Sequence, residues 1–164
     1  RNGKDSEWLE LLLNFKADPS AECTDRKEVP IVGAIYYAKP PIQKINIELL
    51  IRAGADLNHR DYLGCTPAQR AMMHNRYDLA YQLLQAGTDF RIKDEQGRDL
   101  MYDVMESEFQ LGTEGWPWRE KLIDFLEDKG ADFTASEKML ALDNPQKFEI
   151  WKKHLAERMK QKNR

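Results

Sequence analysis

The sequence predicts an all-α solenoid in which helix–turn–helix units stack on one another. Three observations predict it: a segment that recurs at a fixed spacing, a glycine after each amphipathic run, and helix-capping residues where the runs begin. Residues 52–58 and 85–91 match at a spacing of 33, as do residues 61–64 and 94–97. A related Gly-Ala-Asp-Phe segment at 130–133 follows 43 residues after the second copy. Self-similarity at this period is typical of a repeat protein, whose units bury their apolar faces only by stacking.

Each unit has signals for where its helices begin and end. Thr66 is a good N-cap and Pro67 suits the first helical position, where its missing N–H costs nothing. Asn144-Pro145 repeats this pattern. Gly54, Gly87 and Gly130 each follow an amphipathic run, where a helix ends on a residue in the left-handed region. Asn75 is expected to end the first helix of its unit in the same way.

The period and its content resemble the ankyrin repeat. The fullest unit has the family's residues at Asp61, Gly64, Thr66, Pro67, Ala71, Leu83, Leu84, Gly87 and Asp89. The resemblance covers about residues 5–134. It implies an all-α ankyrin-repeat solenoid with capping helices at both ends, which binds a protein partner through loop tips and the exposed ends of its first helices. It implies no reaction and no cofactor.

We therefore expect one domain over residues 1–164. It would comprise an N-terminal cap helix at 5–16, repeats at 24–60, 61–93 and 94–134, and a C-terminal cap at 135–164. The first repeat has Val29-Pro30 and so lacks a capping hydroxyl, whereas Asp99 can still cap in the third. Lys16 stands where glycine is expected. The third repeat carries ten extra residues, which fall near the segment 109–119, and we treat that segment as an insertion.

The C-terminal segment departs from the repeat. Phe148, Trp151, Leu155 and Met159 recur at steps of three and four residues, which predicts an amphipathic helix from Asn144 to about Lys160. Its other face is basic, with Lys147, Lys152, Lys153, Arg158 and Lys160. This pattern favours a capping helix with a polar outer face. The alternative is a basic helix that docks on a membrane or in a calmodulin-like groove.

Composition and charge narrow the function. The 164 residues include 25 basic and 28 acidic ones, and a net charge of −3 argues against a nucleic-acid binder. Residues 94–134 hold 12 acidic and 4 basic residues, net −8, which is either a solvated face or a docking surface for a partner with a basic patch. No apolar run reaches the ~18 residues of a transmembrane span.

Residues for catalysis or metal binding are not evident. The spacings of His59, His74 and His154 do not suit metal ligation, and two cysteines are too few for a four-cysteine zinc site. No phosphate-binding loop or nucleophile motif occurs. We predict no catalytic, cofactor-binding or metal-binding residues.

The resemblance places candidate partner-binding residues on the loop tips and the first-helix ends: Tyr36, Tyr37, Tyr62, Leu63, Met73, His74, Glu95, Gln96 and Glu106. Tyrosine and methionine are typical interface residues. The alternatives are that the tyrosines only cover the stacked helices and that His74 serves packing or capping. Trp116 and Trp118 in the insertion are further candidates, because exposed tryptophan is costly; each either folds back or anchors a partner. We expect one to do each.

The predicted function is protein binding, by a chain that is monomeric on its own. The first hypothesis is a stoichiometric inhibitor or immunity protein that neutralises a toxin or enzyme; similar small bacterial ankyrin proteins neutralise secreted antibacterial lipases. The alternative is a scaffold or adaptor. The chain begins at Arg1 rather than at a methionine, so the absence of a signal peptide does not separate a cytoplasmic from a bacterial periplasmic location.

Overall fold

The computed structural model describes residues 4–23, 25–107 and 115–162, which form α-helices joined by loops, with one isolated β-bridge between Cys23 and Glu28. The helices are α1 (Lys4–Asn14), α2 (Pro30–Tyr37), α3 (Ile42–Arg52), α4 (Pro67–Met73), α5 (Tyr77–Gln85), α6 (Leu100–Glu106), α7 (Trp116–Asp128), α8 (Thr134–Asp143) and α9 (Pro145–Lys162). The predicted all-α solenoid is confirmed.

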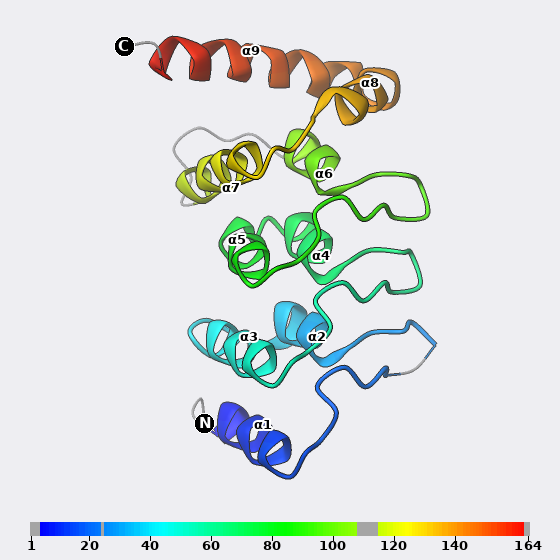
Figure 1. The fold of residues 1–164 in the computed structure, drawn as a ribbon, viewed down its shortest axis with the longest axis vertical. Helices are drawn as coiled ribbons and strands as arrows, with labels where there is room; N and C mark the ends of the chain where they lie inside the picture. The colour runs from blue at the N-terminus through cyan, green and yellow to red at the C-terminus, as the bar shows by residue number, and fades with distance from the viewer. Residues whose placement is uncertain (1–3, 24, 108–114, 163–164) are drawn as a thin grey trace.

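The helices stack in two parallel rows (Figure 1). One row, here the first-helix row, contains α2, α4, α6 and α8, and each packs on the next. The second-helix row contains α1, α3, α5 and α7. Long loops leave the stack beside α2, α4 and α6, on the side away from the second-helix row. The helix α9 lies across the C-terminal end of the stack, against α6 and α8.

The predicted helix starts are confirmed. Thr66 and Gln69 form a capping box, in which the Gln69 N–H donates to the Thr66 hydroxyl and the Gln69 side chain accepts from the Thr66 N–H at 3.0 Å. Asp99 caps α6 by accepting the Tyr102 N–H at 3.0 Å. No side chain caps α2 at Val29, as its sequence predicts.

The predicted helix stops are confirmed as well. Gly54, Gly87 and Gly130 have φ values of 83°, 106° and 73°, and Asn75 has a φ of 54°. Lys16 takes the position of a glycine and adopts the same left-handed conformation, with a φ of 61°. The backbone geometry of the stop is therefore kept even where the sequence lacks glycine, at the cost of the strain that a Cβ brings there.

Two glycine substitutions with opposite expected effects test this assignment. Gly87→Ala should lower the free energy of unfolding by about 1–2 kcal/mol, because a Cβ is disfavoured in the left-handed region. Gly33→Ala should raise it by about 0.5–1 kcal/mol, since Gly33 lies within α2 and an added Cβ meets no atom within 4 Å. Urea denaturation of both variants measures this. An unchanged midpoint for Gly87→Ala would contradict the proposed repeat register.

The core runs without a break along the stack between the two rows. Its largest apolar side chains are less than 2% exposed and come from α2, α3, α5, α6, α7 and α9: Ile31, Ile47, Leu50, Leu79, Leu83, Leu100, Met105, Leu122, Ile123, Leu126 and Trp151. The N-terminal end is different, because Trp8 and Leu12 of α1 and Phe15, which follows it, are exposed. The solenoid is thus covered at its C-terminal end and apolar at its N-terminal end.

The C-terminal region differs from the sequence prediction in one element. The sequence predicted no helix for the segment 134–143. The structure has a helix there, α8, which stacks on α6 in the first-helix row. Ser136 of α8 donates its hydroxyl to Asp99 at 2.8 Å, which joins the two helices through the cap of α6. The expected α9 follows, and Asn144 accepts the Lys147 N–H at 3.2 Å.

The two faces of α9 are not divided as predicted. Trp151 is 1% exposed, and Phe148 and Leu155 are half-buried, but Met159 is 65% exposed. The assignment of Arg158 to the outer basic face is wrong. Its side chain is buried and pairs with Glu120, Asp124 and Glu127 of α7.

These ion pairs also change the interpretation of the acidic block. Lys162 adds contacts to Asp124 at 3.4 Å and to Glu127 at 2.6 Å, beside those of Arg158. Part of the net charge of −8 that residues 94–134 carry is therefore paired with basic side chains of α9 in the same chain. The remaining acidic residues of that block include Asp103 and Glu106, which lie on α6.

Candidate functional site

The loop before α4 is organised by a buried carboxylate. The Asp61 side chain is 1% exposed and accepts the backbone N–H groups of Leu63 at 2.9 Å and Cys65 at 3.1 Å. The guanidinium of Arg70, on α4, forms an ion pair with its other oxygen. A charge-assisted contact to a buried carboxylate fixes both partners, so the loop and the helix hold one geometry.

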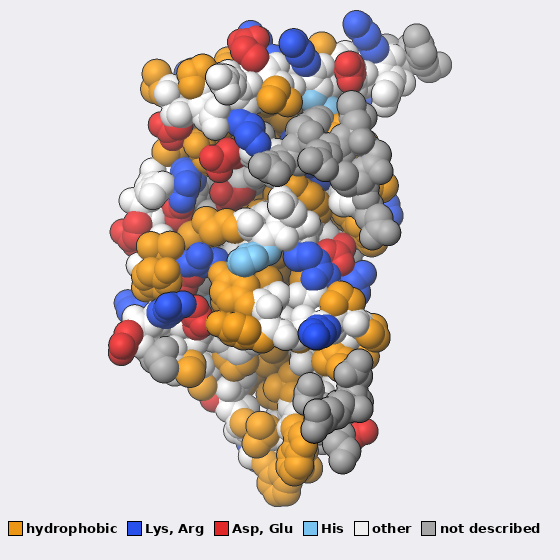
Figure 2. Space-filling model, turned by 180° about the vertical axis from the view of Figure 1, so that it is seen from behind, with side chains coloured by type: hydrophobic (Ala, Val, Ile, Leu, Met, Phe, Trp, Pro, Cys, Tyr) orange, Lys and Arg blue, Asp and Glu red, His pale blue; other side chains and the backbone are white. Residues whose placement is uncertain are grey.

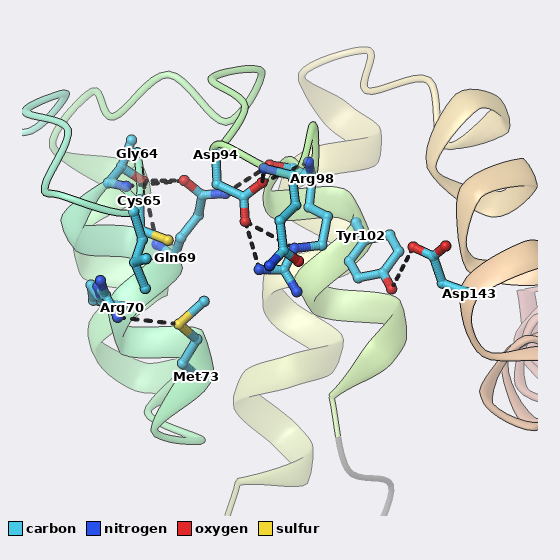
Figure 3. A network of polar contacts seen from close by, with 12 residues as sticks. Gly64, Cys65, Gln69, Arg70, Met73, Asp94, Arg98, Tyr102 and Asp143 are labelled. Atoms are coloured by element: carbon cyan, nitrogen blue, oxygen red, sulfur yellow. Dashed lines mark hydrogen bonds and ion pairs between the residues drawn. The ribbon is translucent and has the colours of Figure 1, made fainter.

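Arg70 also joins the loop tip to the end of α4. Its guanidinium stands 5.6 Å from the ring centre of Tyr62, and its Nη1–H donates to the Met73 sulfur at 3.7 Å (Figure 3). These contacts place Tyr62 and Met73 around one cation. Both side chains keep substantial exposure, 49% and 43% respectively.

Aromatic rings continue this surface across α2 and the end of α4. The Tyr36 ring lies 4.6 Å from the His74 ring and meets Tyr37 edge-on at 6.0 Å. Burial raises the pKa of the Tyr36 hydroxyl, and Arg70 opposes that effect. Tyr37 is 75% exposed, which is far more than a residue that only covers the helices beneath it needs.

We use the name recognition face for the surface that combines the half-buried Tyr36 with the exposed side chains around it: Tyr37, Tyr62, Leu63, Met73 and His74. Apolar side chains gather around the middle of the stack with a histidine among them, and again at the N-terminal end (Figure 2). The structure thus brings six of the predicted partner-binding residues onto the loop tips and helix ends of the first-helix row.

Glu95 and Gln96 are exposed at the tip of the next loop. The Glu95 N–H donates to the Leu63 carbonyl at 3.0 Å, so the two loop tips are joined through their backbones. Its carboxylate pairs with Arg60 at 3.2 Å, in an exposed contact of the kind that adds little stability. The acidic tip lies beside the recognition face as an extension of it.

Glu106 belongs to a pocket beside Met73. The pocket has a volume of about 560 Å³ and is bordered by the ends of α4 and α6 and the start of α9. Asp103, one turn before Glu106, also lines it and is 7% exposed. Burial raises the pKa of the Asp103 carboxyl to about 8.

A polar network joins α4, the loop before α6, and α8 (Figure 3). The side-chain amide of Gln69, on α4, donates to the Arg98 carbonyl at 3.1 Å. The Arg98 guanidinium donates two hydrogen bonds to the Asp94 carboxylate, at 2.7 and 2.9 Å. The Tyr102 hydroxyl donates to Asp143 of α8 at 3.3 Å. Successive units are therefore locked to one another beneath the exposed side chains, which makes the surface preorganised.

Trp116 and Trp118 lie apart from the recognition face, in the first turn of α7. Trp118 is half-buried, 5.9 Å from the Tyr81 ring of α5, with the Lys121 ammonium 4.4 Å from its ring centre. Trp116 is half-buried with its ring 5.3 Å from His154 of α9. Both tryptophans thus fold back onto the stack. The expectation that one of them contacts a partner gains no support from this placement.

The rest of the predicted insertion is described only in part. Residues 109–114 lie outside the described residues. Pro117 lies in the first turn of α7, where proline is tolerated, so it does not interrupt the helix as the proline in the sequence would suggest. Arg119 is 1% exposed and donates to the Val104 carbonyl at 2.7 Å, so the end of the insertion ties α7 to α6.

Two residues of the site escaped the sequence analysis, Arg70 and Asp103. The 33-residue period places them at the same position of consecutive repeats, so the cation that holds Asp61 is replaced by an anion in the third repeat. Arg98, from the loop instead, takes over the pairing with Asp94. Aligning the two repeats by charge as well as by motif would have singled out Asp103.

Two other kinds of site are absent from the described part of the chain. No group of three or more histidine, cysteine, aspartate or glutamate side chains is placed to hold a metal ion. None of the described helices is long and apolar enough to span a membrane.

Comparisons of the sequence with known proteins give partial likenesses. No family model matches the sequence. It is 27% identical over 107 residues to the inactive serine/threonine-protein kinase TEX14 of Bos taurus, covering 62% of this chain and 7% of that protein. It is 38% identical over 60 residues to the ADP-ribosylation factor GTPase-activating protein AGD4 of Arabidopsis thaliana, covering 37% of this chain and 8% of that protein. The chain thus spans less than a tenth of these curated relatives.

Among solved structures, the ankyrin repeat domain of Bcl-3 superposes with a TM-score of 0.54 and 21% sequence identity, covering 72% of this chain and 44% of that domain's chain. The repeat, its caps and stops, and this likeness agree. The chain has the ankyrin-repeat fold, as the resemblance in its sequence predicted.

Proposed function

We propose that the chain is a protein-binding module that recognises its partner through the recognition face. The observation that carries the proposal is the cluster around Arg70. There Tyr62 and Met73 are held in place by a buried ion pair and yet remain half exposed. Aromatic side chains that are already held in place lose little entropy on binding and are usual anchors of protein interfaces, where methionine is also enriched.

At a finer level, we propose a stoichiometric inhibitor or immunity protein that neutralises one toxin or enzyme, of which a secreted antibacterial lipase is an example. The support is the small size of the recognition face and the coverage of the C-terminal end of the stack by α9, which buries Trp151 there. The acidic tip at Glu95 and the pocket at Glu106 favour a partner with a basic patch.

A scaffold or adaptor is the second candidate. It is favoured by the relatives, in which the matching segment forms less than a tenth of a much longer protein. A module of that kind brings its partner to other domains without altering the partner's activity. The two candidates differ in one measurable property, which is whether an enzymatic partner loses its activity when one equivalent of this protein is added.

The partner can be found by site-directed cross-linking in cells of the source organism. A photoreactive amino acid at Tyr62 should cross-link a defined protein, whereas the same amino acid at Glu48, exposed on α3 of the opposite row, should not. Mass spectrometry then identifies the product. Equal products from both positions would contradict binding through the recognition face.

With that partner purified, alanine substitutions measure the contribution of each anchor. Tyr62→Ala and Tyr37→Ala should each weaken binding by about 2 kcal/mol, the size expected of an aromatic hot spot. Trp118→Ala is the matched aromatic control. It should keep the wild-type affinity and lower the melting temperature by about 2–6 °C, because a half-buried ring is removed from the stack. Calorimetry and thermal denaturation give both values.

A further inference from the structure

The pocket beside the recognition face has a negative lining. It lies where α4 and α6 end, and its wall includes Met72 and Met73 from α4, and Asp103 and Glu106 from α6. The C-terminal ends of helices carry partial negative charge from their unpaired carbonyls. Two helix ends and two carboxyl groups therefore face the same space of about 560 Å³.

Asp103 is buried at this pocket without a complete set of partners. Its residue is 7% exposed, and its Oδ2 has no hydrogen-bond partner among the residues that the structure describes. Arg98, whose charge lowers the pKa of Asp103, is engaged by Asp94 at 2.7 and 2.9 Å. A buried carboxyl oxygen without a partner is costly, so a group that satisfied it would gain that free energy on binding.

Lys147 lines the pocket from α9 and is the cation of this chain that could compete for the site. Within the described residues it forms no ion pair with Asp103 or Glu106, since no nitrogen–oxygen distance falls within 4 Å. It is half-buried in the first turn of α9. The acidic side chains of α6 at this pocket are therefore not paired with Lys147.

We propose that this pocket receives a lysine or arginine side chain of the partner, which pairs with Asp103 and Glu106. The proposal rests on the proposed function and names the partner chemistry at the edge of the same surface. Met72 and Met73 would contact the aliphatic stem of the guest side chain, while its charged end reaches the carboxyl groups.

The protonation state of Asp103 in the empty pocket should make this binding depend on pH. Burial raises the pKa of Asp103 to about 8, with Asp94 and Glu106 adding to the rise and Arg98 and Gln69 opposing it. At neutral pH the empty pocket thus holds a protonated carboxyl group. A guest cation favours the ionised form, so its binding releases part of a proton, about half for a fall of one unit in the pKa, and strengthens as the pH rises from 6 to 8.

Three blocked tripeptides, Ac-Gly-Lys-Gly-NH₂, Ac-Gly-Arg-Gly-NH₂ and Ac-Gly-norleucine-Gly-NH₂, test the pocket on the full chain. The norleucine peptide has a side chain of similar length to lysine but no charge. The carboxyl carbon of ¹³C-labelled Asp103 is followed by NMR during pH titrations. Saturation with the lysine or the arginine peptide should lower its midpoint by at least about one pH unit, and the norleucine peptide should leave it unchanged.

Two substitutions separate the pocket from adsorption of cations elsewhere. Asp103→Asn keeps the shape and should weaken the cationic peptide by at least about tenfold. Lys147→Gln removes the competing cation and should tighten it about threefold. Equal binding of the norleucine peptide, an unmoved Asp103 titration at saturation, or unchanged affinity in folded Asp103→Asn would each overturn the proposal.

The outcome does not depend on that of the cross-linking experiment. The peptides test the pocket without the partner, and the photoreactive group at Tyr62 tests the recognition face without Asp103. If the peptides bind as expected and no partner is cross-linked, the pocket stands and the proposed function fails. If a partner is cross-linked and the peptides do not perturb Asp103, the proposed function stands and the pocket assignment fails.

Discussion

The wild-type protein should lose much of its stability as the pH rises from 5 to 8, and replacing Asp103 with asparagine should remove this loss. In the folded protein the pKa of Asp103 is raised to about 8 by burial, whereas an aspartate in the unfolded chain has its ordinary pKa near ~4. Between these values the folded state keeps a proton that the unfolded state has lost. The contribution of Asp103 to stability is therefore greatest at low pH and falls as the pH rises.

The expected size is about 3–4 kcal/mol across this interval, at about 1.4 kcal/mol for each pH unit. Urea denaturation of the wild type and of Asp103→Asn at pH 5, 6, 7 and 8 measures the difference between the two. Glu106→Gln is the matched control. It removes a neighbouring negative charge but should leave most of the pH dependence in place. Parallel profiles for the wild type and Asp103→Asn would show that Asp103 does not titrate as described.

Replacing Trp151 with alanine should lower the free energy of unfolding by about 3–5 kcal/mol, the cost of removing a large buried aromatic side chain. The Trp151 ring stacks on Phe133 at 5.7 Å, lies 5.6 Å from the Arg119 guanidinium, and donates its indole N–H to Glu137 at 2.9 Å. A single side chain of α9 thus contacts α7, α8 and the loop that joins them.

Ile150→Ala is the matched control, because Ile150 is the preceding residue of α9 and is 43% exposed; it should cost less than about 1 kcal/mol. Thermal and urea denaturation of both variants give the comparison. Similar, small effects for both would mean that α9 is not held on the stack through Trp151, and would revive the alternative in which α9 docks elsewhere.

The parts of the fold that the sequence predicted are those that depend on neighbouring residues. The cap at Thr66, the cap at Asp99, and the left-handed stops at Gly87 and Asn75 all involve residues within a few positions of one another. The period of 33 residues then sets the order of the stacked units. Local rules and the period together were enough for the fold class.

The parts that the sequence did not predict depend on contacts between distant residues. Arg158 has the spacing of an exposed helix position, and only the packing of α9 against α7 brings it to Glu120 and Asp124. The burial of Asp103 likewise depends on α4 and α9 closing around α6. The helix α8 was missed because it departs from the repeat motif, although it stacks in the same row.

The candidate site was predicted unevenly for the same reason. The loop tips and first-helix ends follow from the repeat, so Tyr62, Met73 and His74 were placed correctly on one side of the stack. The tryptophans of the insertion have no counterpart in the repeat, and their contacts with Tyr81 and His154 could not be read from the spacing.

Binding of a protein to the recognition face is tested most directly by hydrogen–deuterium exchange. The exchange is measured on this protein alone and in complex with the partner that cross-linking identifies. Amide exchange in residues 59–65 and 92–98, the loops that carry Tyr62 and Glu95, should slow at least about tenfold on binding. Exchange along α3 and α5, in the opposite row, should stay as in the free protein. Slowed exchange confined to the second-helix row or to α1, with both loops unchanged, would contradict the claim.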